Sequence, residues 1–368
     1  MTKMRLILAG GGTAGHVNPL LATASALADH EIVCLGTAEG LEAELVPDAG
    51  HELVTIAKIP LPRRPSPDLV RLPGAMRTQV RRLRRLYAER SIDVVVGFGG
   101  YVSTPAYLAA RGEKIPVVIH EQNARPGLAN RLGARFADVV ALTFDSTPLR
   151  ARRGLTRTIG LPLRPPIAAL ARRRAQGGAG DARREQAARF GLDPDRPIVV
   201  VTGGSLGALT INDAMASAAA QLRPDVQVIH LCGRGKDAAV RADVGEREGY
   251  VIIDYLRDME AALALADLVV CRSGAGTVAE LCALGIPAIY VPLAIGNGEQ
   301  RLNAADVVAA GGARIVPNSQ CSAKRLLAEI TTIFDDSERL ATMSRAAASC
   351  GHLDAADQLA ELVEGARR

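Results

Sequence analysis

The sequence is poor in aromatic residues and in patterned cysteines. Of its 368 residues, 3% are aromatic and none is tryptophan, so stacking platforms for nucleic-acid bases and aromatic clamps for sugars are not expected. The six cysteines show neither a CxxC pair nor the Cys/His spacing of a zinc site. That pattern favours reduced, mostly buried thiols in a cytosolic protein. We therefore expect no nucleic-acid partner and no cofactor.

Long apolar runs are also missing. No stretch approaches the roughly 20 apolar residues that span a bilayer, and residues 1–5 lead directly into a short strand, so we expect neither a transmembrane helix nor a signal sequence. With 48% hydrophobic and 23% charged residues, the composition is that of a folded globular protein. The length suits two domains better than one core.

Positive charge is concentrated in one segment. Residues 1–158 hold 21 Lys and Arg against 14 Asp and Glu, whereas residues 159–368 hold 23 against 25. Residues 63–90 carry nine Arg, and an apolar stripe at helical spacing runs among them, comprising Met76, Val80, Leu83 and Tyr87. We expect this stripe to pack on its own domain. The Arg face is either a solvated helix surface or a contact for an anionic surface such as lipid head groups, nucleic acid or a phosphorylated acceptor.

One sequence pattern, a strand followed by a glycine turn and a helix, occurs twice. A strand runs into AGGGTAGHVNP at 9–19, and another runs into VTGGSLGA at 201–208; a helix follows each. Each opening has a downstream partner of strand, glycine turn and helix, at 93–110 and at 267–281. A glycine turn before a helix offers free backbone N–H groups and the helix dipole to an anion. The pattern predicts an α/β protein with two doubly wound Rossmann-like domains facing a cleft, and a phosphate-bearing ligand, as in nucleotide-sugar enzymes.

Apolar β-rich runs place the central strands and the domain boundary. We predict strands at 6–9, 32–35, 94–96, 117–119 and 139–142, and in the second half at 198–201, 227–231, 251–254, 268–271 and 288–291. The domains are predicted at 1–161 and 162–349, with residues 350–368 packing back on the first. Residues 171–185 are expected to form a mobile loop before a helix. Helices are expected at 337–349 and 354–365, with Ser337 and Asp354 as N-caps.

Two short motifs suggest other chemistry. Gly10, Gly12 and Gly15 spell the dinucleotide fingerprint GxGxxG, but Asp29 and Glu31 precede the second strand instead of ending it. A nicotinamide-dependent enzyme is therefore the weaker hypothesis, and it leaves the second glycine loop unexplained. The stretch 193–195, Asp-Pro-Asp, mimics a metal-binding DxD motif, but its position before a strand favours a turn. We predict no metal site.

Six motifs in order resemble one family. They are GGGTAGHVNP, GFGGYVSTP, HEQN, GGSLGA, RSGAGTVAE and GNGEQRLN, and together they cover nearly the whole chain. The chain resembles the MurG-type transferases that add N-acetylglucosamine (GlcNAc) from UDP-GlcNAc to lipid-linked muramyl-pentapeptide in peptidoglycan synthesis. The resemblance implies a two-domain GT-B fold, with the donor in the C-terminal half and the acceptor in the N-terminal half.

The resemblance assigns donor-binding residues to the C-terminal half. Ser205 and Arg164 are expected at the diphosphate, Leu256 beside the uracil, and Glu280 at the ribose hydroxyls, although by itself Glu280 is an ordinary helical surface acid. Gln300 and Glu299 are expected at the sugar hydroxyls. A helix start is expected along the phosphates and ribose, comprising Ser273, Gly274, Ala275, Gly276 and Thr277.

In the N-terminal half, the resemblance implies a loop that faces the donor sugar. It comprises Thr13, Ala14, Gly15 and His16, with Asn123 approaching the same sugar. His16 is a candidate catalytic base, although a lone His is usually structural. His120 and Glu121 are the second catalytic candidates; the alternative is a buried pair that supports the loop of Asn123. The acceptor diphosphate is expected at a third group, comprising Gly97, Gly99, Gly100 and Tyr101.

Two residues depart from the family pattern, and several functions stay open. Leu161 replaces a usual Asn in the connector, and Glu299 stands where many members have Gln. The resemblance implies an inverting transfer to the 4-hydroxyl of undecaprenyl-diphosphate-linked MurNAc-pentapeptide. It also implies a peripheral protein on the anionic cytoplasmic face of the bacterial cell membrane. The alternatives are a UDP-GlcNAc 2-epimerase, a transferase acting on a small natural product, a redox Rossmann enzyme and a nucleotide-sugar sensor.

Overall fold

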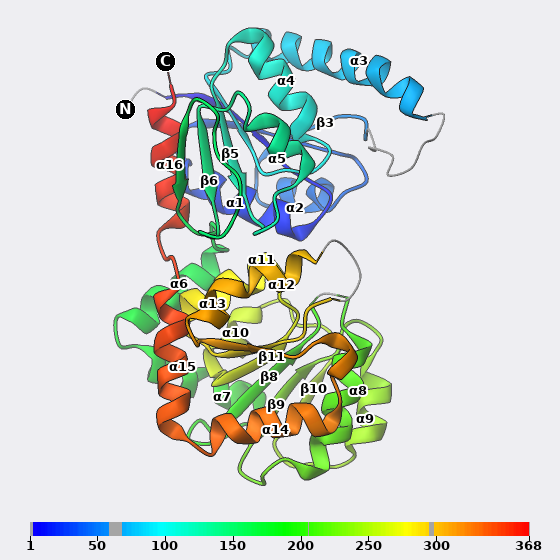
Figure 1. Cartoon of the computed structure of the whole chain (residues 1–368), viewed down its shortest axis with the longest axis vertical. Coiled ribbons are helices and arrows are strands. Elements are labelled where there is room, and N and C mark those ends of the chain that lie inside the picture. Colours follow the sequence, from blue (N-terminus) through cyan, green and yellow to red (C-terminus); the bar gives the residue numbers. More distant parts are fainter. Residues whose placement is uncertain (1–2, 59–67, 205, 294–297, 368) are drawn as a thin grey trace. The chain divides into compact units, whose positions relative to one another are not determined.

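The computed structural model describes residues 3–58, 68–204, 206–293 and 298–367. It separates into two compact units, which Figure 1 shows in sequence colours. Unit 1 comprises Met1–Arg164 and Asp354–Arg368, and unit 2 comprises Pro165–Leu353. The chain therefore leaves unit 1 after Arg164 and returns to it at Asp354.

Unit 1 is built on a seven-stranded sheet in the order β3-β2-β1-β4-β5-β6-β7. All neighbouring strands are parallel. Parallel neighbours need crossover connections, which helices supply except between β6 and β7, where residues 143–154 contain no helix. The strands are β1 (Arg5–Ala9), β2 (Glu31–Gly36), β3 (Glu52–Thr55), β4 (Val94–Gly97), β5 (Val117–Glu121), β6 (Val139–Leu142) and β7 (Leu155–Thr158).

Helices cover both faces of this sheet because alternate strand residues point to opposite sides. Leu6 and Leu8 of β1 share one core with α1 and α16, and Ile7 of the same strand lies in the other core with α3 and α4. The helices of unit 1 are α1 (Ala14–Ala26), α2 (Glu42–Asp48), α3 (Asp68–Glu89), α4 (Ser103–Glu113), α5 (Leu128–Gly133) and α16 (Ala355–Gly365).

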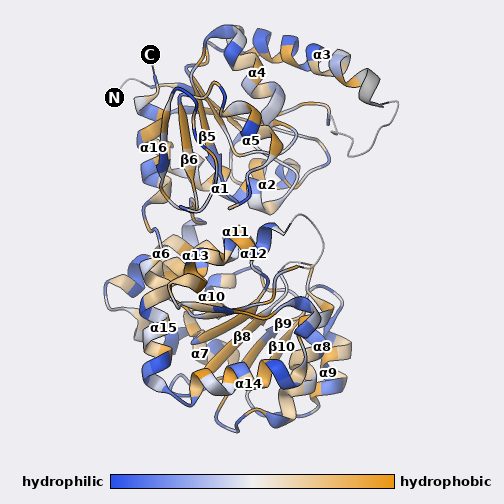
Figure 2. Ribbon diagram, in the orientation of Figure 1, coloured by the Kyte–Doolittle hydropathy of each residue, from blue (hydrophilic) through white to orange (hydrophobic). Residues whose placement is uncertain are grey.

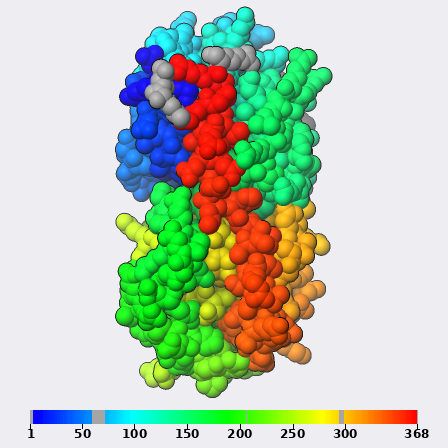
Figure 3. All heavy atoms as spheres, turned by 90° about the vertical axis from the view of Figure 1, so that its left-hand side faces the viewer, coloured from blue at the N-terminus to red at the C-terminus, as the bar shows by residue number. Residues whose placement is uncertain are grey.

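The C-terminal helix α16 belongs to unit 1. Leu359 and Val363 are buried in the core that α1 forms with the sheet, and Figure 3 shows the red α16 lying beside blue N-terminal residues. His30 also contacts this helix, with its Nε2 3.0 Å from Oε1 of Glu364. Because Nδ1 of His30 accepts a hydrogen bond from the backbone N–H of Met4, Nε2 carries the proton and donates to the carboxylate.

Unit 2 repeats the architecture with a six-stranded parallel sheet in the order β10-β9-β8-β11-β12-β13. Its strands are β8 (Ile198–Thr202), β9 (Gln227–Leu231), β10 (Tyr250–Ile253), β11 (Leu268–Cys271), β12 (Ala288–Tyr290) and β13 (Ala313–Ile315). Its helices are α6 (Pro165–Ala175), α7 (Ala179–Phe190), α8 (Leu209–Ala218), α9 (Asp237–Val244), α10 (Met259–Leu265), α11 (Ala275–Leu284), α12 (Glu299–Asn303), α13 (Ala305–Ala309), α14 (Ala323–Phe334) and α15 (Ser337–Ser349).

The predicted fold class of two doubly wound Rossmann-like domains is confirmed. All ten predicted strands are present, and three further strands, β3, β7 and β13, lie at sheet edges. Edge strands carry polar and half-exposed residues, as in Leu-Thr-Arg-Thr of β7, so their apolar signal is weak. Figure 2 shows the contrast between the apolar central strands and helices such as α3, which are polar on one side.

Residues 171–185 were predicted as a mobile loop, and this is wrong. They form the end of α6 and the start of α7, separated only by a turn at 176–178 in which Gly177 has φ +87°. Ala, Arg, Gln and Glu are strong helix formers, and they outweigh the glycines on which the loop prediction rested.

The predicted C-terminal helices are present, but their caps differ. Asp336, not Ser337, caps α15 by accepting a hydrogen bond from the N–H of Arg339. Asp354 occupies the N-cap position of α16, and its side chain makes no capping hydrogen bond within the described residues. None of the helices in the described ranges has the length and apolar character needed to cross a bilayer.

Candidate active site

Three loops of unit 1 lie at the carboxyl ends of adjacent strands. They follow β1, β4 and β5, which are neighbours in the sheet. Because the strands are parallel, residues 10–16, 98–102 and 122–127 emerge at one edge, where ligands of doubly wound sheets bind. The predicted site residues of the N-terminal half therefore belong to one region of unit 1.

His16 is the titratable side chain of the first loop. It lies in the first turn of α1, and its Nδ1 is 3.1 Å from the hydroxyl oxygen of Thr13. Burial lowers the pKa of His16 below its usual 6.5, although the Gly11 backbone and the Glu42 carboxylate act in the opposite direction. The imidazole is therefore neutral at pH 7 and able to accept a proton.

The second loop places glycines against His16. Gly99 and Gly100 have φ +89° and +81°, a region that favours glycine. A Cβ at Gly99 would lie 3.3 Å from Nε2 of His16 and 3.4 Å from Nδ2 of Asn130, and one at Gly100 would lie 2.8 Å from the carbonyl oxygen of Gly11. The two glycines let the loops approach closely. Tyr101, the next residue, is 42% exposed.

Gly97 differs from its neighbours because it is buried within β4. A Cβ there would lie 2.0 Å from the hydroxyl oxygen of Tyr107. The structure thus gives Gly97 a packing role at the end of the strand, whereas Gly99, Gly100 and Tyr101 lie in the loop that follows it.

Glu121, at the end of β5, is buried and holds the third loop. Its Oε1 accepts a hydrogen bond from the N–H of Asn123 at 3.0 Å, and its Oε2 accepts from the N–H of Gly127 at 3.0 Å and from Nδ2 of Asn130 at 2.9 Å. Burial raises the pKa of Glu121 against the opposing effect of these hydrogen bonds. Its contacts support the loop that presents Asn123.

His120 is also fully buried. Its Nε2 lies 2.9 Å from the carbonyl oxygen of Gly160, to which it donates, and Nε2 of Gln122 donates to its Nδ1 at 3.3 Å. Burial lowers the pKa of His120 to about 4. The ring therefore stays neutral and ties β5 to the connector that includes the buried Leu161.

In unit 2, three loops again emerge at the carboxyl edge, after β10, β8 and β11. They contain the half-buried Leu256, three glycines at positions 203, 204 and 207, and the start of α11. Gly207 has φ +66°, and a Cβ there would lie 2.0 Å from the carbonyl oxygen of Cys232, so the loop after β8 packs tightly on the loop after β9. Ser205 lies outside the described residues.

The start of α11 has the features of an anion site. Gly274 is the N-cap and Ala275 the first helical residue, and Gly276, Thr277 and Glu280 follow half-buried on the same helix. The hydroxyl oxygen of Ser273 is buried without a hydrogen-bond partner among the described residues. Free N–H groups, a helix dipole and an orphan hydroxyl are what a phosphate oxygen requires.

The remaining predicted donor residues lie in two other segments of the chain. Oε1 of Gln300 accepts a hydrogen bond from the N–H of Leu293 at 2.9 Å, and Glu299 begins α12 half-buried. Arg164 ends the first segment of unit 1, half-exposed.

The Asp-Pro-Asp stretch forms a turn, as predicted. Oδ1 of Asp193 accepts a hydrogen bond from the N–H of Asp195 at 2.9 Å. Within the described ranges, no group of three or more His, Cys, Asp or Glu could hold a metal ion.

Sequence reasoning missed three buried polar residues that organise the loops of unit 1: Glu42, Tyr107 and Asn130. The Tyr107 hydroxyl donates to Oδ1 of Asn130 at 2.7 Å, and Glu42 binds the first glycine loop. Each lies within or beside a helix, and no motif marks it. Only burial of a polar group could have identified them.

Both halves of the chain match glycosyltransferase models. The glycosyltransferase family 28 N-terminal domain matches residues 6–142, and the C-terminal domain of the same family matches residues 198–359. These matches and the two Rossmann-like units define the class: a glycosyltransferase of the two-domain GT-B architecture.

Relatives named UDP-N-acetylglucosamine–N-acetylmuramyl-(pentapeptide) pyrophosphoryl-undecaprenol N-acetylglucosamine transferase are similar along nearly the whole chain. The protein of Bifidobacterium longum is 48% identical over 97% of this chain and 96% of its own length. That of Clavibacter sepedonicus is 49% identical over 98% and 96%. The chain belongs to this family, and the resemblance drawn from its motifs is confirmed.

Solved structures agree. The crystal structure of Acinetobacter baumannii MurG matches with a TM-score of 0.80 at 28% identity, covering 99% of this chain and 100% of that one. A UDP-GlcNAc 2-epimerase from Neisseria meningitidis matches with a TM-score of 0.70 at 15% identity, covering 98% and 100%. At that identity the second likeness shows a shared fold alone.

Proposed function

We propose that the chain transfers GlcNAc from UDP-GlcNAc to the 4-hydroxyl of MurNAc-pentapeptide-diphospho-undecaprenol, converting lipid I to lipid II in peptidoglycan synthesis. The observation that carries the proposal is the 45–49% identity to transferases of that name over 97–98% of the chain. The geometry supports it, because each unit presents glycine loops suited to a diphosphate ligand.

Most of the proposed donor-binding residues lie in unit 2, whereas Arg164 is the last residue of the first segment of unit 1. The backbone N–H groups at the start of α11 and the Ser273 hydroxyl bind the UDP phosphates, and Ser205 and Arg164 bind the same diphosphate. Leu256 contacts the uracil, and Glu280 accepts hydrogen bonds from the ribose hydroxyls. Sugar hydroxyls bind two residues of α12, Glu299 and Gln300. The support for this assignment is that the loops after β10, β8 and β11 share one sheet edge.

The reaction is a single in-line displacement. The donor glycosidic bond is α and the product bond β, so the acceptor oxygen attacks C1 from the face opposite UDP. As the new C1–O bond forms, the C1–O bond to the diphosphate breaks and UDP leaves with the bonding electrons. A base removes the hydroxyl proton, and positive groups stabilise the charge on UDP.

His16 is the base in this proposal. When its Nδ1–H donates to the Thr13 hydroxyl oxygen, the lone pair that can take the proton is on Nε2, which lies beside Gly99. The lowered pKa keeps that nitrogen unprotonated at neutral pH. The structure supports positioning roles for His120 and Glu121, since both are buried and their polar atoms bind the connector and the loop of Asn123.

The acceptor binds unit 1. Its diphosphate binds the loop of Gly99, Gly100 and Tyr101, at which the chain turns into α4 (Ser103–Glu113). Residues 13–15 and Asn123 complete this part of the site next to the donor sugar. Tyr101 supplies an exposed aromatic ring and hydroxyl for the acceptor.

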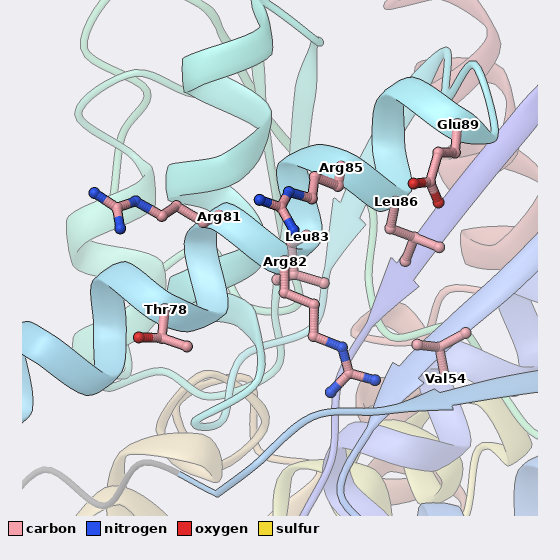
Figure 4. Close-up of a pocket in the computed structure, with 8 residues that line it drawn as sticks. All are labelled: Val54, Thr78, Arg81, Arg82, Leu83, Arg85, Leu86 and Glu89. Carbon is pink, nitrogen blue, oxygen red and sulfur yellow. The ribbon is translucent and has the colours of Figure 1, made fainter.

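The acceptor lipid stays in the bilayer, so we propose that unit 1 binds the anionic cytoplasmic face of the cell membrane through α3. The predicted apolar stripe packs inward, with Leu83 and Tyr87 in the core. At the edge of this core, a hollow of about 450 Å³ is lined by Val54, Thr78, Arg81, Arg82, Leu83, Arg85, Leu86 and Glu89. Figure 4 shows Arg82 reaching toward Val54 and Arg81 pointing away from it. Arginines beside apolar side chains suit lipid phosphates. Residues 63–67 of the basic segment lie outside the described residues.

The test is UDP release from UDP-GlcNAc with and without a short-chain lipid-linked MurNAc-pentapeptide. The proposal requires acceptor-dependent release and a β-1,4-linked disaccharide product. Release without acceptor would favour an epimerase-like reaction. Donor binding without turnover in either mixture would favour a nucleotide-sugar sensor.

A further inference from the structure

Glu42 begins α2, and its carboxylate is fully buried beside the first glycine loop. Three glycines surround it. A Cβ at Gly11, Gly36 or Gly40 would lie 2.4, 2.4 or 2.1 Å from its side-chain atoms. The Glu42 side chain therefore packs directly against these glycines, and none of the three has room for a side chain of its own.

Two loops at the edge of the sheet donate hydrogen bonds to this carboxylate. Oε2 accepts a hydrogen bond from the N–H of Gly12 at 2.8 Å, and Oε1 accepts from the N–H and the hydroxyl of Thr37 at 2.8 and 2.7 Å. Burial raises the pKa of Glu42, but these hydrogen bonds outweigh that effect and lower it. The group is thus a carboxylate at neutral pH.

Gly12 lies in the turn that leads to His16. Its N–H points at Glu42, although a glycine turn before a helix normally offers such N–H groups to a ligand anion. Gly11 precedes Gly12 in the chain. A Cβ at Gly100 would lie 2.8 Å from the carbonyl oxygen of Gly11. A change at Glu42 would therefore move the loop of His16 and the contact between the two glycine loops.

We propose that Glu42 is an internal anion that occupies the first glycine loop and positions His16 for the reaction. The inference rests on the proposed function for the role of His16. It also gives the two glycine loops of unit 1 different roles. The N–H of Gly12 in the first loop is already bound by the protein's own carboxylate, so the acceptor diphosphate binds the loop of Gly99 and Gly100.

Glu42→Gln is a sharp test because it changes one atom. An amide has a single acceptor oxygen, so its NH₂ must face either the N–H of Gly12 or that of Thr37, and two donors then oppose each other. Glu44→Gln is the matched control: it makes the same change of charge on the same helix, where Glu44 is exposed.

The measurements are the melting temperature, the fraction of active sites, kcat, and the KM for each substrate. We expect Glu42→Gln to lower kcat about 10-fold or more while the KM for UDP-GlcNAc stays within about two-fold, since the residues proposed to bind UDP, apart from Arg164, lie in unit 2. Glu44→Gln should match the wild type. Wild-type kcat in Glu42→Gln would overturn the inference, and so would an equal loss in both variants.

A second variant keeps the test decisive if Glu42→Gln does not fold. Thr37→Val removes one hydroxyl donor and should lower kcat about three-fold at unchanged KM for UDP-GlcNAc. In Glu42→Ala, formate should restore part of kcat and neutral formamide should not. Equal effects of the two additives would refute an anion site. Absence of acceptor-dependent UDP release in the wild type would instead reject the proposed function.

Discussion

The variant Tyr107→Phe loses one buried hydroxyl. It tests whether the hydrogen-bonded series Tyr107, Asn130 and Glu121 positions the loops of unit 1. The Tyr107 hydroxyl donates to Oδ1 of Asn130 at 2.7 Å, and Nδ2 of Asn130 donates to Oε2 of Glu121 at 2.9 Å. Burial raises the pKa of Tyr107, so its hydroxyl stays protonated and remains a donor. Without it, Oδ1 of Asn130 is left buried and unpaired.

An unpaired buried acceptor costs about 2 kcal/mol of unfolding free energy. Tyr87→Phe is the control. It removes another buried hydroxyl from unit 1, but that hydroxyl donates a long hydrogen bond, of 3.4 Å, to the carbonyl oxygen of Ala106 in α4. We expect this variant to lose less than about 1 kcal/mol. For a domain of this size, the two losses correspond to melting temperatures lower by roughly 4–8 °C and by less than about 4 °C.

Thermal unfolding followed by circular dichroism measures both effects, and transferase assays of the same samples measure the functional consequence. Tyr107→Phe should also lower kcat several-fold, because Asn130 no longer fixes Glu121 and the loop of Asn123. Equal melting temperatures for the two variants, or full activity in Tyr107→Phe, would contradict the positioning role of this chain.

Further predictions concern the base, the donor loop and the membrane contact. His16→Ala should lower kcat by about 10²-fold with donor binding by calorimetry retained; near-normal turnover would reject His16 as the base. Because burial lowers the pKa of His16, kcat/KM of the wild type should be constant around pH 7 and fall only below pH 6.5, and a fall that begins above that value would contradict the assignment. Gly207→Ala puts a Cβ 2.0 Å from a backbone oxygen and should cost about 1–3 kcal/mol of stability in denaturant titrations; an unchanged midpoint would refute the close approach. Charge reversal to Glu should abolish co-sedimentation with anionic vesicles when made at Arg81, Arg82 and Arg85, and not when made at the exposed control residues Arg152, Arg153 and Arg157. Undiminished binding in the first variant would reject the α3 contact.

The membrane test spares Arg84 for a structural reason. Its Nε lies 2.5 Å from Oε1 of Glu113 on α4, so its reversal would place two carboxylates together and disturb the packing of α3. Restricting the change to the arginines that line the hollow separates loss of membrane binding from loss of structure.

The sequence predicted the sheet centres because their residues are apolar on both faces. Residues 94–97 and 198–202 are buried throughout, as expected of parallel strands covered by helices on two sides. The edge strands β3 and β13 mix polar with apolar residues over three or four positions, which no periodicity can distinguish from a loop. The same limit explains the failure at 171–185, where three glycines led to a loop prediction although two helices are present.

The site was predictable only as far as its motifs extend. Glycine turns and helix starts are local, so the loops of His16 and Ser273 could be placed from the sequence. The buried groups that hold these loops act over long separations: Glu42 binds Gly12, and Tyr107 binds Asn130. Such pairings depend on tertiary packing. The role of Gly97 likewise emerged only when Tyr107 was seen against it.

The most direct test of the account is the acceptor dependence of UDP release. Purified protein would be given UDP-GlcNAc alone and UDP-GlcNAc with a short-chain lipid-linked MurNAc-pentapeptide, with UDP and the disaccharide product quantified together. The account predicts UDP and β-1,4-linked disaccharide in equal amounts, formed only when the acceptor is present. Release of UDP at the same rate without acceptor, or intact donor binding without any product, would contradict it.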